Sequence, residues 1–139
     1  MSDQSENIFT DELENFTGGC LCGEIKFRSV NPPYNTGYCH CKICRKSLGN
    51  LFGTWVILKR KDLEYVTREP DWYQSSDEVR RGFCGKCGSP IVFQPMKRDF
   101  DAVWIGTIDG AERFKPRGHF HTENKIPWVD IHDDLPVRS

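Results

Sequence analysis

Seven cysteines stand in three short groups along a chain of 139 residues. An odd number cannot pair completely as disulfides, and cysteines that only pack in a core would be scattered rather than grouped. C-x-C and C-x-x-C spacing in a reducing compartment is typical of metal ligation. Sites rich in thiolate favour zinc, with iron second. The groups are Cys20-Leu21-Cys22, Cys39-His40-Cys41-Lys42-Ile43-Cys44 and Cys84-Gly85-Lys86-Cys87.

Seven thiols divide naturally into four and three. Four thiolates complete a tetrahedral structural zinc site, whereas three leave a position open for water or substrate. Cys39, Cys41 and Cys44 lie within six residues, so they can share one ion at little cost in loop closure. This partition leaves four cysteines for a closed site that would join the start of the domain to its middle: Cys20, Cys22, Cys84 and Cys87.

A second partition stays open on these grounds. It places Cys20, Cys22 and Cys39 in the open site and the other four cysteines in a zinc-ribbon or rubredoxin-like site. Local geometry favours the first partition. Glycines flank its closed set, as tight coordinating turns require. A thioredoxin-like role for Cys41-x-x-Cys44 is disfavoured because the chain lacks the βαβ pattern that accompanies it.

Charge and hydropathy exclude several classes of function. Nineteen basic and twenty acidic residues give a net charge of −1, and the mean hydropathy is −0.58, so no basic footprint for nucleic acid or an anionic membrane is present. No apolar run approaches the ~20 residues of a membrane span, and no secretory signal is visible. We therefore expect a cytoplasmic protein with reduced thiols and with no nucleic-acid or membrane partner.

The segments that must position the cysteines have strand periodicity, which predicts a mainly β fold of short packed sheets. Residues 1–15 carry five acidic side chains and no basic one, which predicts a solvated, poorly ordered tail before a single domain over 16–139. One helical turn is expected over 43–47. Strands are expected over 24–28, 52–58, 63–67, 71–75, 79–83, 91–93 and 103–108.

Other polar and aromatic side chains have simpler interpretations than a site. Alternation points His40 away from Cys39 and Cys41, which predicts a structural or exposed role. Arg45, Lys46 and Ser47 can contact a carboxylate of an anionic thiol, but an exposed turn is the simpler interpretation. We expect His119 and His121 on a packed or solvated strand, His132 at the surface, and core or pocket-wall roles for Phe52, Trp55, Trp72, Trp104 and Trp128.

The three groups, in this order and with their flanking glycines, resemble the glutathione-dependent formaldehyde-activating enzyme family, which also includes the centromere protein V type of domain. The resemblance covers residues 16–137. The matching elements are Gly18–Gly23, Cys39–Arg45, Phe83–Pro90 and Ile105–Asp109, followed by Pro116, His119, Trp128, Asp133 and Leu135-Pro136.

The resemblance implies a β-tent fold and a carbon–sulfur lyase that acts on S-(hydroxymethyl)glutathione, with a small thiol such as glutathione as partner. A site of three thiolates suits thiolate handling better than strong water activation, because the thiolates make the zinc unit formally negative. The alternatives are a non-catalytic module whose zinc ions hold the fold, or the same chemistry on another thiol or aldehyde. The implied ligands are Cys20, Cys22, Cys84 and Cys87 for a structural zinc, and Cys39, Cys41 and Cys44 for an open, catalytic zinc.

Overall fold

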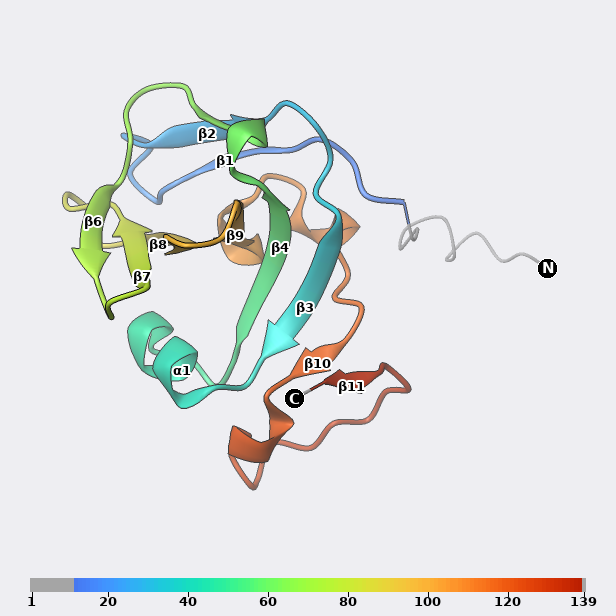
Figure 1. Cartoon of the computed structure of the whole chain (residues 1–139). Coiled ribbons are helices and arrows are strands. Elements are labelled where there is room, and N and C mark those ends of the chain that lie inside the picture. The colour runs from blue at the N-terminus through green and yellow to red at the C-terminus, as the bar shows by residue number, and fades with distance from the viewer. Residues whose placement is uncertain (1–11, 139) are drawn as a thin grey trace.

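The computed structural model describes residues 12–138, and over this range it is mainly β, as the sequence predicts (Figure 1). Its strands form a three-stranded sheet in the order β1-β2-β5 and an eight-stranded sheet in the order β11-β10-β3-β4-β9-β8-β7-β6. The small sheet contains β1 (Thr17–Gly19), β2 (Lys26–Ser29) and β5 (Leu63–Tyr65).

The large sheet contains most of the strands that the sequence predicts. Its strands are β3 (Asn35–Cys39), β4 (Gly53–Lys59), β6 (Asp71–Gln74), β7 (Val79–Phe83), β8 (Pro90–Pro95), β9 (Phe100–Trp104), β10 (His119–Phe120) and β11 (Val137–Arg138). The single α-helix in the described part of the chain is α1 (Lys42–Leu48). Short 3-10 turns connect the strands: η2 (Arg60–Asp62), η3 (Ile105–Thr107), η4 (Ala111–Arg113) and η5 (Thr122–Asn124).

Most neighbouring strands pair antiparallel, but β10 is the exception. It pairs in parallel with β3 on one side and with β11 on the other. Parallel neighbours need a long connection. Between β3 and β10 the chain passes through α1 and strands β4 to β9, and between β10 and β11 it passes through η5 and a loop. In Figure 1 this C-terminal segment lies beside the end of β3, where the second cysteine group begins.

The main core lies between one face of the large sheet and the small sheet. Alternate residues of the central strands, such as Val56 and Val103, are fully buried there. The ring of Phe16 meets Phe27 and Phe114 edge-on, with centroid separations of 6.2 and 5.8 Å. Such pairs add about 1 kcal/mol each beyond the area that they bury.

One predicted strand is shorter than expected at its C-terminal end. The sequence predicts extended chain over 103–108, but β9 ends at Trp104 and the chain turns into η3. The Thr107 hydroxyl donates to the Trp104 carbonyl at 2.8 Å, and the Ile108 N–H donates to the Ile105 carbonyl at 3.0 Å. These local bonds stabilise a turn that apolar periodicity does not reveal.

Most of the predicted acidic tail, residues 1–11, lies outside the described residues. The end of this predicted tail is not free of contacts: Leu13 packs against the main core, and the Glu14 carboxylate lies 3.4 Å from the Arg113 guanidinium. Between residues 12 and 138, none of the helices has the length and hydropathy needed to cross a membrane.

Candidate metal centres and adjoining cavities

The first cluster joins two loops that are far apart in the sequence. Cys20 and Cys22 lie between β1 and β2, and Cys84 and Cys87 lie in the turn between β7 and β8. Their four Sγ atoms all lie within 4.8 Å of one another. Cys84 is fully buried, whereas Cys22 is exposed at the edge of the cluster. We call this the four-sulfur cluster.

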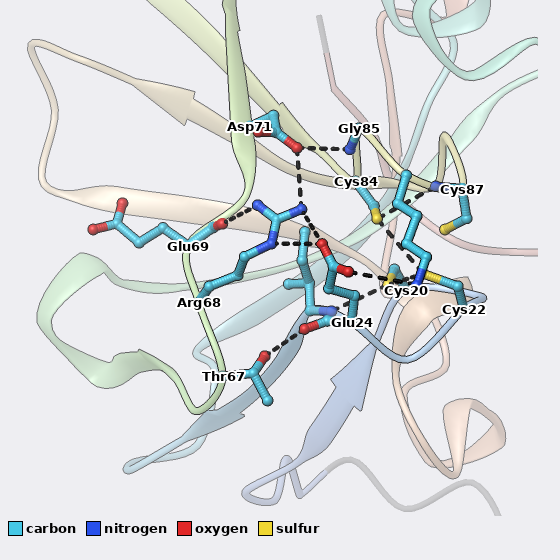
Figure 2. A network of polar contacts seen from close by, with 12 residues as sticks. Cys20, Cys22, Glu24, Thr67, Arg68, Glu69, Asp71, Cys84, Gly85 and Cys87 are labelled. Atoms are coloured by element: carbon cyan, nitrogen blue, oxygen red, sulfur yellow. Dashed lines mark hydrogen bonds and ion pairs between the residues drawn. The ribbon is translucent and has the colours of Figure 1, made fainter.

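Polar contacts hold the two loops of the four-sulfur cluster together (Figure 2). Arg68 lies between them and reaches Glu24 at 2.9 Å and Asp71 at 3.3 Å. Asp71 accepts a hydrogen bond from the N–H of Gly85 at 2.7 Å, which, with Arg68, lowers the pKa of its carboxyl group. Glu24 also lies 3.6 Å from the Lys86 ammonium. The residues between β5 and β6 therefore bridge both cysteine loops.

Glycine is required where these loops turn. Gly23 and Gly88 each follow a cysteine pair and each have φ of +82°, which is favourable only for glycine. At Gly85 the requirement is close approach, because a Cβ there would lie 2.7 Å from the Asp71 carboxylate. The glycines that the sequence analysis associated with tight turns thus serve two distinct purposes.

The second cluster is built from one continuous segment. Cys39 ends β3, Cys41 is the N-cap of α1, and Cys44 lies in the first turn of that helix. Their Sγ atoms lie within 4.8 Å of one another, and no fourth Cys, His, Asp or Glu between residues 12 and 138 joins the group. We call this the three-sulfur cluster. The helix forms where one turn is predicted, and Gly49 ends it with φ of +64°.

The sulfur separations fit metal coordination. A tetrahedral zinc with Zn–S bonds of about 2.3 Å has S–S edges of about 3.8 Å. Cys20 to Cys22 and Cys22 to Cys84 are 3.6 and 3.8 Å apart, and Cys39 to Cys44 is 3.6 Å. A disulfide would need about 2.0 Å, and all seven cysteines are free. The grouping is that of the first partition.

Charge within the clusters also suits a cation. Hydrogen bonds from the thiols of Cys39 and Cys44 lower the pKa of Cys41 to about 2, whereas contacts with Cys41 and Cys44 raise the pKa of Cys39. Three sulfurs this close cannot all be negative unless a cation lies among them. Backbone N–H groups point at the sulfurs as well, from Ile25 to Cys20 at 3.2 Å and from Cys44 to Cys41 at 3.3 Å. Both clusters therefore fit a divalent metal that prefers thiolate ligands, as zinc does.

A line of hydrogen bonds starts at His40, which stands between Cys39 and Cys41 in the chain, and ends at Asp133. Nε2 of His40 lies 3.0 Å from Nδ1 of His119, and Nε2 of His119 lies 2.9 Å from the carboxylate of Asp133. Both rings are nearly inaccessible, and Tyr38 stacks on His119 at 4.6 Å. Burial and the neighbouring His119 lower the pKa of His40. His40 is therefore buried rather than exposed, which agrees with the structural half of the expectation, whereas the contact of His119 with Asp133 has no signal in sequence spacing.

Two cavities lie near the three-sulfur cluster, but only the first is lined by its cysteines. An apolar cavity of about 200 Å³ is bordered by the sulfur-bearing residues Cys39 and Cys44 and by aromatic side chains. A larger groove of about 790 Å³ lies between α1 and strands β6 and β7, and its cations are Lys42, Lys46 and Arg81. Trp104 borders both spaces.

The other side chains considered in the sequence analysis lie in different depressions of the surface. Lys46 and Ser47 line the basic groove, where the Arg81 guanidinium donates to the Ser47 hydroxyl at 2.9 Å, whereas Arg45 lines a different depression. Trp55 and Trp104 are cavity walls as predicted. Trp128 is 70% exposed and therefore not a core residue, but it lines the same depression as Arg45.

His121 is a cavity residue that sequence reasoning missed. Strand alternation groups it with His119, but β10 ends at Phe120, and His121 adopts φ of +60°. It borders the apolar cavity together with Cys39 and Cys44. A left-handed conformation in a residue other than glycine is uncommon and is concentrated at functional sites.

The fold and these clusters define a small β protein with one centre of four thiols and one centre of three thiols that borders a cavity. The model of the family described as "Glutathione-dependent formaldehyde-activating enzyme" matches residues 15–124. The chain therefore belongs to that family, as the resemblance of its cysteine groups indicated.

Individual relatives agree with this assignment. The chain is 36% identical to a Halomonas elongata protein named "Putative glutathione-dependent formaldehyde-activating enzyme", over 82% of this chain and 79% of that protein. It is 25% identical to an uncharacterized lyase of Schizosaccharomyces pombe, over 58% of each chain. A solved structure of a Rhodobacter sphaeroides protein shares the fold, with a TM-score of 0.55 at 19% identity, over 87% of this chain and 98% of that one.

Proposed function

We propose that the protein is a zinc-dependent carbon–sulfur lyase that cleaves or forms adducts of a thiol and an aldehyde, of the S-(hydroxymethyl)glutathione type. Cys20, Cys22, Cys84 and Cys87 would hold a structural zinc, and the three-sulfur cluster would hold the catalytic one. Bound there, zinc stabilises a thiolate or polarises a carbonyl oxygen. The seven free thiols suit a reducing compartment, and we assign the reaction to the cytoplasm.

One observation carries this proposal. The three-sulfur cluster offers three ligands where a closed zinc site needs four, and two of its cysteines border a cavity. A purely structural site would be expected to be complete, as the four-sulfur cluster is. The relatives named as a formaldehyde-activating enzyme and as a lyase point to the same reaction class.

The bonds that break and form in this reaction require a residue that accepts and returns a proton. In the cleavage direction the carbon–sulfur bond breaks, and its electron pair leaves with the sulfur as a thiolate. The carbinol hydroxyl loses its proton as the carbonyl double bond forms. Apart from the cysteines, His121 is the ionisable residue that borders the apolar cavity within the described chain. We assign its imidazole to accept that proton and to return it in the direction of adduct formation.

The basic groove gives the thiol partner a binding site. Glutathione carries carboxylates, and Lys46 and Arg81 line a space large enough for a tripeptide. Charge-assisted hydrogen bonds of this kind contribute roughly 1.5–3 kcal/mol. Arg81→Met should therefore raise KM for the glutathione adduct about tenfold, and it should affect the adduct of uncharged 2-mercaptoethanol much less.

The deciding experiment compares zinc-loaded wild type with Cys41→Ser on S-(hydroxymethyl)glutathione. We expect turnover to fall at least about a hundredfold, because the open site loses a ligand. Circular dichroism should show a folded variant, and Ser76→Ala, at an exposed position, serves as control. Unchanged turnover in folded Cys41→Ser would refute the lyase proposal and favour a non-catalytic module.

A further inference from the structure

One face of the large sheet is apolar but is not part of the main core. Side chains alternate along β4 and β9, so that Val56 and Val103 point into the main core, whereas Trp55, Ile57 and Ala102 point the other way. In the register of the sheet, Trp55 lies opposite Trp104, and Ala102 lies between Ile57 and Phe93. These residues form the wall of the apolar cavity.

Two cysteines of the three-sulfur cluster, Cys39 and Cys44, border the same cavity. Cys39 ends β3 and pairs with Phe120 of β10, and both border the cavity. No Lys, Arg, Asp or Glu of the described chain is among the lining residues. A ligand that reaches the three-sulfur cluster through this cavity therefore meets aromatic and aliphatic surface, which penalises a charged or strongly polar group.

The size of the cavity sets the size of its occupant. A cavity of about 150 Å³ lined by apolar side chains accommodates benzene, and this one holds about 200 Å³. Formaldehyde has one carbon and one oxygen, so it would leave most of the space without a partner. A six-membered ring or a branched chain of similar size, attached to an aldehyde carbon, matches both the volume and the lining.

The two spaces that Trp104 borders differ in charge. The groove carries Lys42, Lys46 and Arg81, and the cavity is apolar. An adduct of an anionic thiol with an apolar aldehyde has the same division, because its sulfur lies between a charged half and an apolar half. A formaldehyde adduct has only the charged half.

We propose that the substrate is the adduct of a carboxylate-bearing thiol with an aldehyde whose substituent is apolar and about the size of a benzene ring. This inference rests on the proposed lyase function and names the aldehyde half of its substrate. The substituent lies against Trp55, Ala102 and Phe93, with the reacting carbon at Cys39 and Cys44. Apolar contact on both sides of Ala102 then determines which aldehydes are accepted.

The test compares two glutathione adducts, one of phenylacetaldehyde and one of formaldehyde, on the zinc-loaded full-length protein. We expect kcat/KM for the phenylacetaldehyde adduct to exceed that for the formaldehyde adduct at least about tenfold. Ala102→Leu fills the cavity and should lower this preference about tenfold. Ala111→Leu, the same substitution on η4 outside the cavity, should leave the preference unchanged.

A second measurement does not depend on turnover or on a folded variant. 2-Phenylethanol, an unreactive probe of the same shape, should shift the amide resonances of Trp55, Ala102 and Phe120 in wild type. Absence of these shifts would overturn the inference.

The outcomes separate the two proposals. Equal or slower turnover of the phenylacetaldehyde adduct, with good turnover of the formaldehyde adduct, overturns the inference and leaves the lyase function standing. Turnover of neither adduct overturns the lyase function and, with it, the inference.

Discussion

The two cysteine clusters use the same ligand type but are built in opposite ways. The four-sulfur cluster joins loops that are distant in the sequence, since Cys84 stands 62 positions after Cys22, and charged contacts of Arg68 hold these loops together. The three-sulfur cluster comes from the end of β3 and one short helix, and it borders the apolar cavity. The difference teaches that ligand spacing in the sequence separates a centre that joins distant segments from one that forms locally, which are the proposed structural and catalytic sites. A crosslink across a long loop constrains the unfolded chain, whereas a local cluster can change its contents without loss of the fold.

The largest expected effect is loss of the fold from the four-sulfur cluster. Cys84→Ser removes a fully buried ligand, and structural zinc contributes on the order of 10 kcal/mol, which is comparable with the whole stability of a domain. We expect an unfolded or insoluble protein by circular dichroism. Cys44→Ser in the three-sulfur cluster should stay folded at 25 °C. If both variants unfold to the same extent, the contrast between the clusters is wrong.

Metal removal should proceed in two stages. A chelator that competes for zinc should take one equivalent first, without change in circular dichroism, because the three-sulfur cluster is open and local. The second equivalent should leave at least about ten times more slowly and together with unfolding. Metal release and ellipticity, followed in the same sample, measure both stages. Simultaneous release of two equivalents would contradict this order.

Loss of the hydrogen bonds between His40, His119 and Asp133 should affect zinc release from the three-sulfur cluster only. His119→Ala leaves His40 and Asp133 without their partner and opens a space beside Tyr38, which should cost about 3 kcal/mol of unfolding free energy. Urea denaturation measures this loss, and the more easily removed zinc should leave faster. His132→Ala, at an exposed position, is the matched control. Faster release of the slowly removed zinc alone would mean that these hydrogen bonds support the other cluster.

The smallest expected effect is a pH dependence at Asp133. The hydrogen bond from His119 holds the pKa of this carboxyl below its ordinary value of 3.8. An acid whose pKa is lowered in the folded state contributes stability above its unfolded pKa, and the contribution is lost as the pH falls through the folded value. Asp133→Asn should therefore be less stable than wild type at neutral pH, and the difference in urea midpoint should shrink below pH 3.8. A difference that grows on acidification would reverse this assignment.

Much of this arrangement could be predicted from local sequence. The grouping of the cysteines follows from spacing and loop closure, and β7 occupies the residues that alternation predicts. The helical turn after Cys41 was expected as well, since its residues and the glycine that ends it are adjacent in the chain.

The rest depends on tertiary pairing that no local pattern contains. The parallel pairing of β10 brings His119 to His40 across 79 residues, and neither residue carries a signal of the other. The apolar cavity arises from register, which sets Trp55 opposite Trp104 and Ala102 beside Phe93. In the sequence these residues look like ordinary strand positions, because alternation shows that a face is apolar but not what lies against it.

The exposure of Cys22 determines how oxidative damage would proceed. Peroxide attacks accessible thiolates first, and the outermost sulfur belongs to the cluster that holds the two sheets together, beside Leu21, which is 89% exposed. In the three-sulfur cluster, Cys39 and Cys44 are buried and Cys41 is half-buried. Oxidation that starts at Cys22 would thus loosen the junction of the two sheets before it reaches Cys39 and Cys44.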